Sequence, residues 1–100
     1  MCSIGDYYQN VVEVVAKVTG VTEEQINGKC RLREIVDARW LVIQLMRKAG
    51  YYPRQIARQK GTSVRSIHKA LALFEFRVKY SPDPMLRTHC EQCKNLLGIN

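Results

Sequence analysis

Residues 53–73 read PRQIARQKGTSVRSIHKALAL, and this stretch decides the predicted fold. Pro53 suits the first turn of a short helix that carries Ile56 and Ala57 and stops at Gly61. A small residue such as Ala57 lets two helices approach closely, and a glycine tolerates the unusual dihedral angles of a tight turn. The stretch therefore predicts a helix-turn-helix.

The second helix of this unit is predicted from its cap and its apolar spacing. Thr62 or Ser63 can cap it, and it should run to about Lys79. Its apolar residues recur at steps of three and four positions and are Ile67, Ala70, Leu71, Phe74 and Val78. With that face buried, the outward face offers Thr62, Ser63, Arg65, Ser66, His68 and Lys69.

The N-terminal part of the chain predicts two further helices. Residues 11–18, VVEVVAKV, have helical spacing of valine, and Gly20 is a plausible stop. Thr22 followed three residues later by Gln25 has the form of a capping box, which predicts a short helix over residues 23–27. After it comes a basic stretch, KCRLR, without apolar periodicity.

Two more helices complete the prediction. Residues 34–49 form the longest one, in which the apolar residues recur at three- and four-residue steps while Gln44 falls largely off that face. After the breaker SPDP, a trailing helix over 84–97 should bury Leu86, Cys90, Cys93 and Leu97. We expect residues 1–100 to form a single all-α domain, a small bundle of about six helices with no convincing strand pair.

The charge of the chain points to nucleic acid as the partner. The net charge is +7, but residues 29–79 hold 13 Lys and Arg against three acids, a net +10, whereas the remaining residues net −3. One strongly basic region is what a protein needs to neutralise phosphates. No stretch approaches a membrane span, and the start lacks the pattern of a signal peptide, so we expect a cytoplasmic protein.

Two basic elements are expected to contact duplex DNA. In a helix-turn-helix the first residues of the second helix reach base edges, and arginine often pairs with guanine. Arg65 is thus the best candidate for a contact with base edges, with Ser66 and Lys69 beside it. The second element is the basic loop 29–33, on the backbone or in the minor groove. The full set of predicted DNA-binding residues is Lys29, Arg31, Arg33, Arg39, Thr62, Ser63, Val64, Arg65, Ser66, His68 and Lys69.

The order of these elements over about Val11 to Leu97 resembles the C-terminal DNA-binding domain of the bacterial replication initiator DnaA. The similarity lies in KCRLREIVDAR around the basic loop and in TSVRSIHKAL at the recognition helix. The resemblance implies that Arg33 enters the minor groove and that Arg39 is the arginine of the long helix. It also places Arg65 and Ser66 where the family has paired threonines.

This sequence also departs from the family. Ser63 and Val64 stand where the family has an Asp-His pair that helps to read the initiator box, so that box is not carried over. The family's ATPase module and its N-terminal partner-binding region are not expected here. A role in replication initiation or its regulation follows from the resemblance, and a transcriptional repressor of Trp-repressor-like architecture is the nearest alternative. The sequence leaves the oligomeric state open.

Other chemistry is less favoured by the sequence. His89, Cys90 and Cys93 form HCEQC, which resembles half of a zinc site, but the two cysteines also lie on an apolar stripe and suit a buried role. No pattern pairs a nucleophile with a base or gathers carboxylates, so we expect no enzyme, cofactor or small-molecule substrate. A helical protein-interaction module is the remaining alternative.

Overall fold

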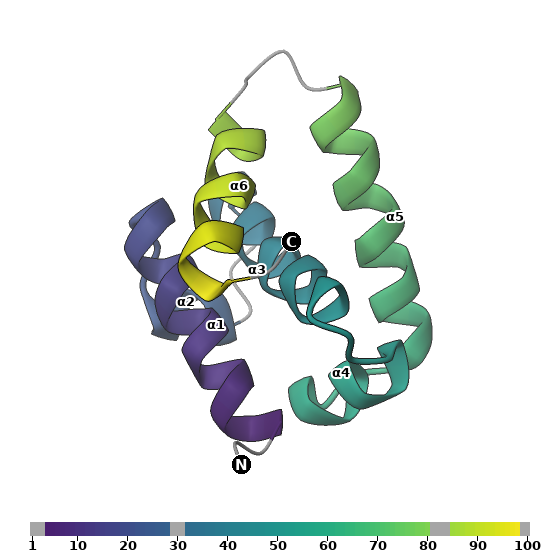
Figure 1. Ribbon diagram of the computed structural model, residues 1–100. Coiled ribbons are helices and arrows are strands. Elements are labelled where there is room, and N and C mark those ends of the chain that lie inside the picture. The colour runs from purple at the N-terminus through teal and green to yellow at the C-terminus, as the bar shows by residue number, and fades with distance from the viewer. Residues whose placement is uncertain (1–3, 29–31, 81–84, 99–100) are drawn as a thin grey trace.

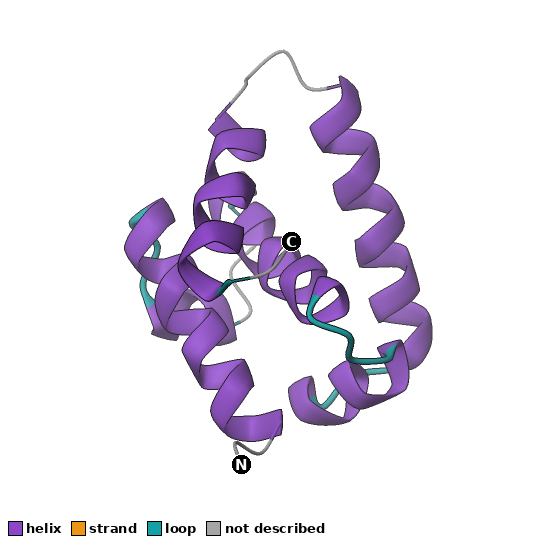
Figure 2. Ribbon diagram, in the orientation of Figure 1, coloured by secondary structure: helices purple, strands orange, loops and turns teal. Residues whose placement is uncertain are grey.

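Six α-helices make up most of the chain that the computed structural model describes, which comprises residues 4–28, 32–80 and 85–98 (Figure 1). They are α1 (Ile4–Thr19), α2 (Glu23–Asn27), α3 (Arg33–Lys48), α4 (Pro53–Lys60), α5 (Val64–Tyr80) and α6 (Met85–Leu97). These ranges contain no strand (Figure 2), so the predicted all-α class with about six helices is confirmed. Over the same ranges, no helix is long and apolar enough to cross a membrane.

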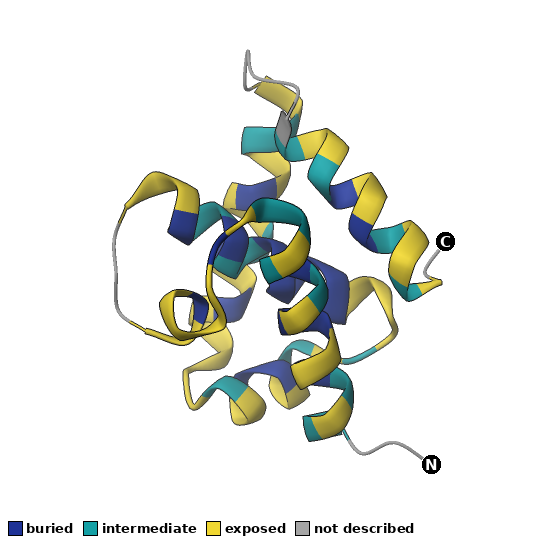
Figure 3. Ribbon diagram, turned by 90° about the vertical axis from the view of Figure 1, so that its left-hand side faces the viewer, coloured by how far each residue is buried: buried dark blue, intermediate teal, exposed yellow. Residues whose placement is uncertain are grey.

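Helix α3 lies at the centre of the arrangement and packs against each of the other five helices. Its side chains are buried on nearly every side from Leu41 to Met46 because neighbours surround it. A single hydrophobic core receives residues from all six helices, and the inward sides of the ribbon are the buried ones (Figure 3). The core therefore fixes α4 and α5 relative to the rest of the molecule.

The capping box and the short helix predicted over residues 23–27 are both confirmed in α2. The Thr22 hydroxyl accepts a hydrogen bond from the backbone N–H of Gln25 at 3.1 Å, and the Gln25 side chain accepts one from the N–H of Thr22 at 3.1 Å. Each partner satisfies a backbone donor that the first turn of a helix leaves unpaired. A capping box can be read from sequence because both partners lie within one turn.

Two expectations about the helices were wrong in part. Helix α1 begins at Ile4, well before Val11, because the buried Tyr8 continues the apolar face by one more turn. Gln44, which the periodicity of α3 places off the apolar face, is only 7% exposed. Its side of α3 is covered since α5 and α6 both pack there.

Candidate nucleic-acid interface

The turn between α4 and α5 is set by Gly61. This residue has a φ of 71°, in the left-handed region that side chains disfavour. The N–H of Gly61 donates to the carbonyl of Arg58 at 3.3 Å, and the N–H of Thr62 donates to that of Ala57 at 2.9 Å. Together these bonds satisfy the carbonyls at the end of α4 and turn the chain sharply into α5.

Small and apolar side chains hold α4 and α5 together. Ile56 and Ala57 of α4 are buried, as are Ile67 and Ala70 of α5. The two helices pack against each other, and both reach the core around α3. Helix α5 is thus held at a fixed angle while its other face stays open.

Ser63 caps α5. Its hydroxyl oxygen accepts a hydrogen bond from the backbone N–H of Ser66 at 3.2 Å, and the two hydroxyl oxygens lie 3.0 Å apart. Of the two caps that the sequence allows, the structure uses Ser63 and leaves Thr62 in the turn. Both serine side chains are exposed, so they remain accessible from outside.

The predicted contact residues of the turn and of α5 share one property, which is exposure to solvent. They are Thr62, Ser63, Val64, Arg65, Ser66, His68 and Lys69. Arg65 makes no hydrogen bond or ion pair with any residue of the described ranges. Between Asp37 and Glu75 the chain has no acidic residue and eight Lys and Arg. The exposed face is therefore open and positively charged.

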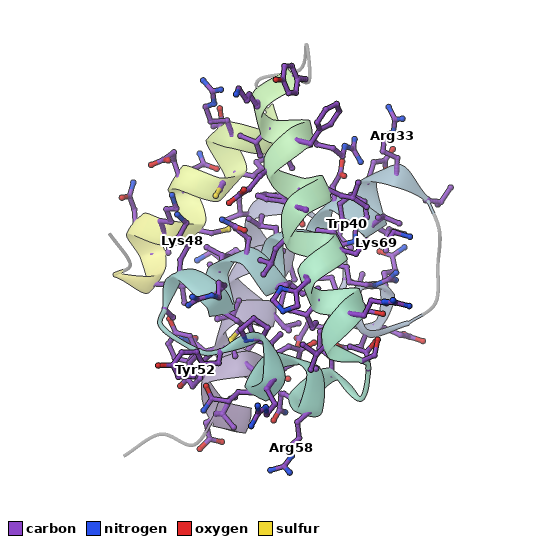
Figure 4. All side chains as sticks on the ribbon, turned by 90° about the vertical axis from the view of Figure 1, so that its right-hand side faces the viewer. Arg33, Trp40, Lys48, Tyr52, Arg58 and Lys69 are labelled. Carbon is purple, nitrogen blue, oxygen red and sulfur yellow. The ribbon has the colours of Figure 1, made fainter. Side chains whose placement is uncertain are left out.

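The second basic element is described only in part. Lys29 and Arg31 lie outside the described residues. Arg33, which the sequence analysis assigned to the basic loop, is instead the first residue of α3. It is exposed and points away from the bundle (Figure 4). Arg33 and Lys69 both project on the same side of α5 in that view.

Arg39, which the resemblance groups with the DNA-binding residues, has a structural task. It is half-buried, and its Nε donates to the carbonyl of Ile26 at 3.0 Å. Its Nη2 donates to the carbonyls of Gln25 at 3.3 Å and Gly28 at 2.8 Å. These carbonyls belong to the end of α2, where a helix leaves acceptors unpaired. Arg39 therefore joins α2 to α3, and a direct contact with DNA stays a prediction.

Two exposed arginines of α4 were missed by the sequence analysis. Arg54 and Arg58 lie one turn apart on a helix that buries only Ile56 and Ala57. Arg58 points away from the molecule in Figure 4. The signal was present in the sequence, because at 3.6 residues per turn Arg54 and Arg58 lie off the helical face that carries Ile56 and Ala57. Both cations enlarge the basic surface beyond α5.

Lys60 was also missed, because the residue that it contacts, Tyr8, lies 52 positions away in the sequence. Its ammonium donates to the hydroxyl of Tyr8 at 3.4 Å and lies 5.8 Å from the centre of that ring. The Tyr8 hydroxyl in turn donates to Oδ1 of Asn27 at 3.5 Å. Burial, and to a smaller extent the charge of Arg39, lowers the pKa of Lys60 to about 8. Lys60 thus ties the end of α4 to α1 and α2.

The cysteines of α6 have a packing role. Cys90 and Cys93 are buried, as expected from their place on the apolar stripe. Burial raises the pKa of both thiols, that of Cys93 to about 12, so both are protonated at neutral pH. Across the described residues, no group of three or more His, Cys, Asp or Glu side chains is placed to hold a metal ion. Cys2 and Cys30 lie outside those residues.

Comparison with protein-family models, with curated proteins and with solved structures gives no match. The resemblance to the initiator domain therefore stays a prediction from the sequence.

Proposed function

We propose that this protein binds double-stranded DNA, with the first turns of α5 in the major groove. The observation that carries the proposal is the open start of α5, where Arg65, Ser66 and Lys69 are exposed after the turn at Gly61 and no acidic residue lies nearby in sequence. The major groove of B-DNA is about 12 Å wide and admits an α-helix. A helix fixed by its neighbours and bare on its outer face suits that groove.

The exposed residues divide into two kinds of contact. Arg65 is assigned to base edges, with Ser66 and Lys69 beside it, because arginine pairs with guanine through two hydrogen bonds. Val64 is 39% exposed and offers an apolar contact to a thymine methyl group. Phosphate contacts are assigned to the residues around them, namely Thr62, Ser63, His68, Arg54 and Arg58.

The basic element at residues 29–33 is assigned to the backbone or the minor groove next to the same site. Arg33 carries this proposal, because it is exposed at the start of α3. Arg39 supports the element indirectly, since it holds the end of α2 from which the chain runs on to Arg33. Lys29 and Arg31 are included on their charge.

A role in replication initiation or its regulation follows from the resemblance to the initiator domain. A repressor of Trp-repressor-like type is the alternative within DNA binding. Selection of bound fragments from a random duplex pool separates the two. An enriched sequence similar to the initiator box favours the first role, and a palindrome favours a dimeric regulator.

A protein-interaction module is a second candidate, favoured by the other half of α5. Leu73, Phe76 and Tyr80 are 37%, 61% and 62% exposed. Their spacing of three and four residues places them on one helical face. This apolar stripe lies C-terminal to the proposed reading residues, so the two activities use different halves of the helix.

The proposal is tested by fluorescence anisotropy with a labelled duplex of random sequence between 50 and 200 mM salt. We expect affinity to fall steeply with salt, with a log-log slope of about −0.9 for each phosphate neutralised. Lys17→Ala, which removes an exposed cation of α1, is the matched control and should leave the slope unchanged. Absence of binding at low salt, or binding that salt does not weaken, would favour the protein-interaction module instead.

A further inference from the structure

The C-terminal half of α5 exposes two neighbouring aromatic side chains. Phe76 and Tyr80 are 61% and 62% exposed, although both could have been buried if they faced the core. Their ring centres lie 4.7 Å apart, with the ring planes tilted by 45°. Helix α5 lies in front of the other helices in Figure 4, so its outer face is turned toward the reader. The two rings are therefore open to a ligand.

The rings lie on the same side of α5 as residues that are proposed to contact duplex DNA. Along this side, residues recur at steps of three and four positions, and they are Arg65, Lys69, Leu73, Phe76 and Tyr80. At 1.5 Å per residue, Phe76 lies about 10 Å from Lys69 along the helix axis. A nucleic-acid strand that follows this side of α5 therefore passes from cations to rings.

Cations flank the two rings. The ammonium of Lys79 lies 5.4 Å from the centre of the Tyr80 ring. On the side that packs against α3, Arg77 forms an ion pair with Asp37. Burial raises the pKa of Asp37, and the charges of Arg77 and Arg33 oppose that rise, so Arg33 lies near the same half of α5. Lys79 and Arg33 are both exposed and add positive charge beside the rings.

These charges argue against a second copy of this chain as the occupant. A pair of α5 helices joined through the rings would gather Lys69 and Lys79 of both copies in one interface. Like charges across an interface repel each other. The single acid of α5, Glu75, lies off this side of the helix and does not balance them. The positive charge favours an anionic partner instead.

We propose that the C-terminal half of α5 binds single-stranded DNA by stacking its bases on Phe76 and Tyr80. Every base has a flat π face, so this stacking requires no particular sequence. Lys69, Lys79 and Arg33 are assigned to the phosphates of the same strand. The choice of DNA rests on the proposed function, because the duplex face and the rings share one side of one helix. The protein would thus hold a duplex next to an unpaired strand.

Fluorescence anisotropy with a labelled oligothymidylate tests the proposal, because this strand does not pair with itself. The comparison probe is a strand of the same length made of abasic sugar-phosphates, which keeps the charge and lacks the bases. We expect oligothymidylate to bind at least about fivefold more tightly, since each stacked base adds affinity. Equal binding of the two probes would show that only phosphates are held, and would overturn the proposal.

Substitutions at Phe76 separate stacking from apolar contact. Phe76→Leu keeps an apolar side chain and removes the π face, so it should weaken oligothymidylate by about five- to 150-fold and leave the abasic probe unchanged. Phe76→Trp keeps a ring and should retain the affinity. Leu96→Ala, at an exposed apolar residue of α6, is the matched control and should change neither probe. If Phe76→Leu binds oligothymidylate as the parent protein does, the rings are left to a protein partner and the proposal is overturned.

NMR of the unaltered protein makes the test independent of variant folding. A base stacked on a ring should shift the ring proton resonances of Phe76 and Tyr80 when oligothymidylate is added. Shifts confined to Arg65, Ser66 and Lys69 would show that the strand binds only at the duplex face, and would overturn the proposal.

Three further measurements distinguish the other possible partners. Tighter binding of oligouridylate than of oligothymidylate would make RNA the partner and overturn the choice of DNA. Sedimentation of the protein alone tests self-association, and a dimer that is lost in Phe76→Leu would overturn the proposal as well. Duplex affinity is measured separately, and Phe76→Leu should leave it unchanged. Either proposal can therefore fail without the other.

Discussion

The first turns of α5 and the junction of α2 with α3 both contain an arginine, but the two arginines have different surroundings. Arg65 is exposed and bonds to no described residue. Arg39 is half-buried and donates to three backbone carbonyls at the end of α2. A guanidinium without protein partners is available to a ligand, whereas one that satisfies carbonyls stabilises the fold. We therefore expect Arg65 to contribute to DNA binding and Arg39 to contribute to the stability of the fold.

The largest expected effect is the loss of stability in Arg39→Ala. Removing the guanidinium removes three hydrogen bonds to backbone carbonyls, and among the described residues only the carbonyl of Gln25 keeps a second donor, the N–H of Gly28. Hydrogen bonds to charged groups contribute about 1.5 to 3 kcal/mol each when well buried. Because the site is partly open to solvent, we expect the free energy of unfolding to fall by about 2 to 4 kcal/mol in total. Urea denaturation followed by circular dichroism measures it.

Arg65→Ala is the matched control for stability, because Arg65 lies on the exposed face. Its free energy of unfolding should stay within about 0.5 kcal/mol of the parent protein. Equal destabilisation by the two substitutions would contradict the distinction between the two regions.

The second effect is on binding and concerns Arg65 itself. Arg65→Ala should lower the discrimination between a selected duplex and a random duplex by about 1 to 3 kcal/mol, because a base contact carries sequence information. Lys29→Ala and Arg31→Ala should weaken both duplexes alike, as phosphate contacts do. Parallel titrations of both duplexes at one salt concentration measure the difference. A uniform loss in Arg65→Ala would move this residue into the phosphate-binding group.

The features that were predictable from sequence depend on neighbours along the chain. The capping box at Thr22, the stop at Gly61 and the 3.6-residue period of α5 all involve residues within two turns of one another. Arg58 was predictable by the same logic, since the pattern of α4 leaves it exposed.

The features that were not predictable depend on packing between distant segments. Arg39 reaches residues 11 to 14 positions away. Lys60 reaches Tyr8, which is 52 positions away. Gln44 is polar and yet buried, because α5 and α6 cover a side of α3 that an isolated amphipathic helix would expose. Periodicity describes one helix at a time and contains no information on how many neighbours surround it.

The smallest expected effect concerns Lys60, which joins the two regions through Tyr8 and Asn27. The pKa of Lys60 is about 8 in the folded protein, below its ordinary value of 10.5. Between pH 8 and pH 10.5 the lysine is therefore more often protonated in the unfolded chain than in the folded protein. The free energy of unfolding should therefore rise with pH above about 8. Tyr8, whose pKa burial raises, opposes this rise once the pH passes its ordinary value of 10.0.

Denaturation between pH 7 and 9.5 measures the rise. One pKa unit corresponds to about 1.4 kcal/mol, and because solvent screens the partly exposed ammonium we expect a rise on the order of 1 kcal/mol. Lys60→Met should remove this rise, since methionine keeps the apolar stem and loses the charge. Lys69→Met, at an exposed lysine of α5, should retain it. If the free energy of unfolding still rose with pH in Lys60→Met, a desolvated Lys60 would not be its cause. The end of α4 would then be joined to α1 and α2 by apolar contacts alone.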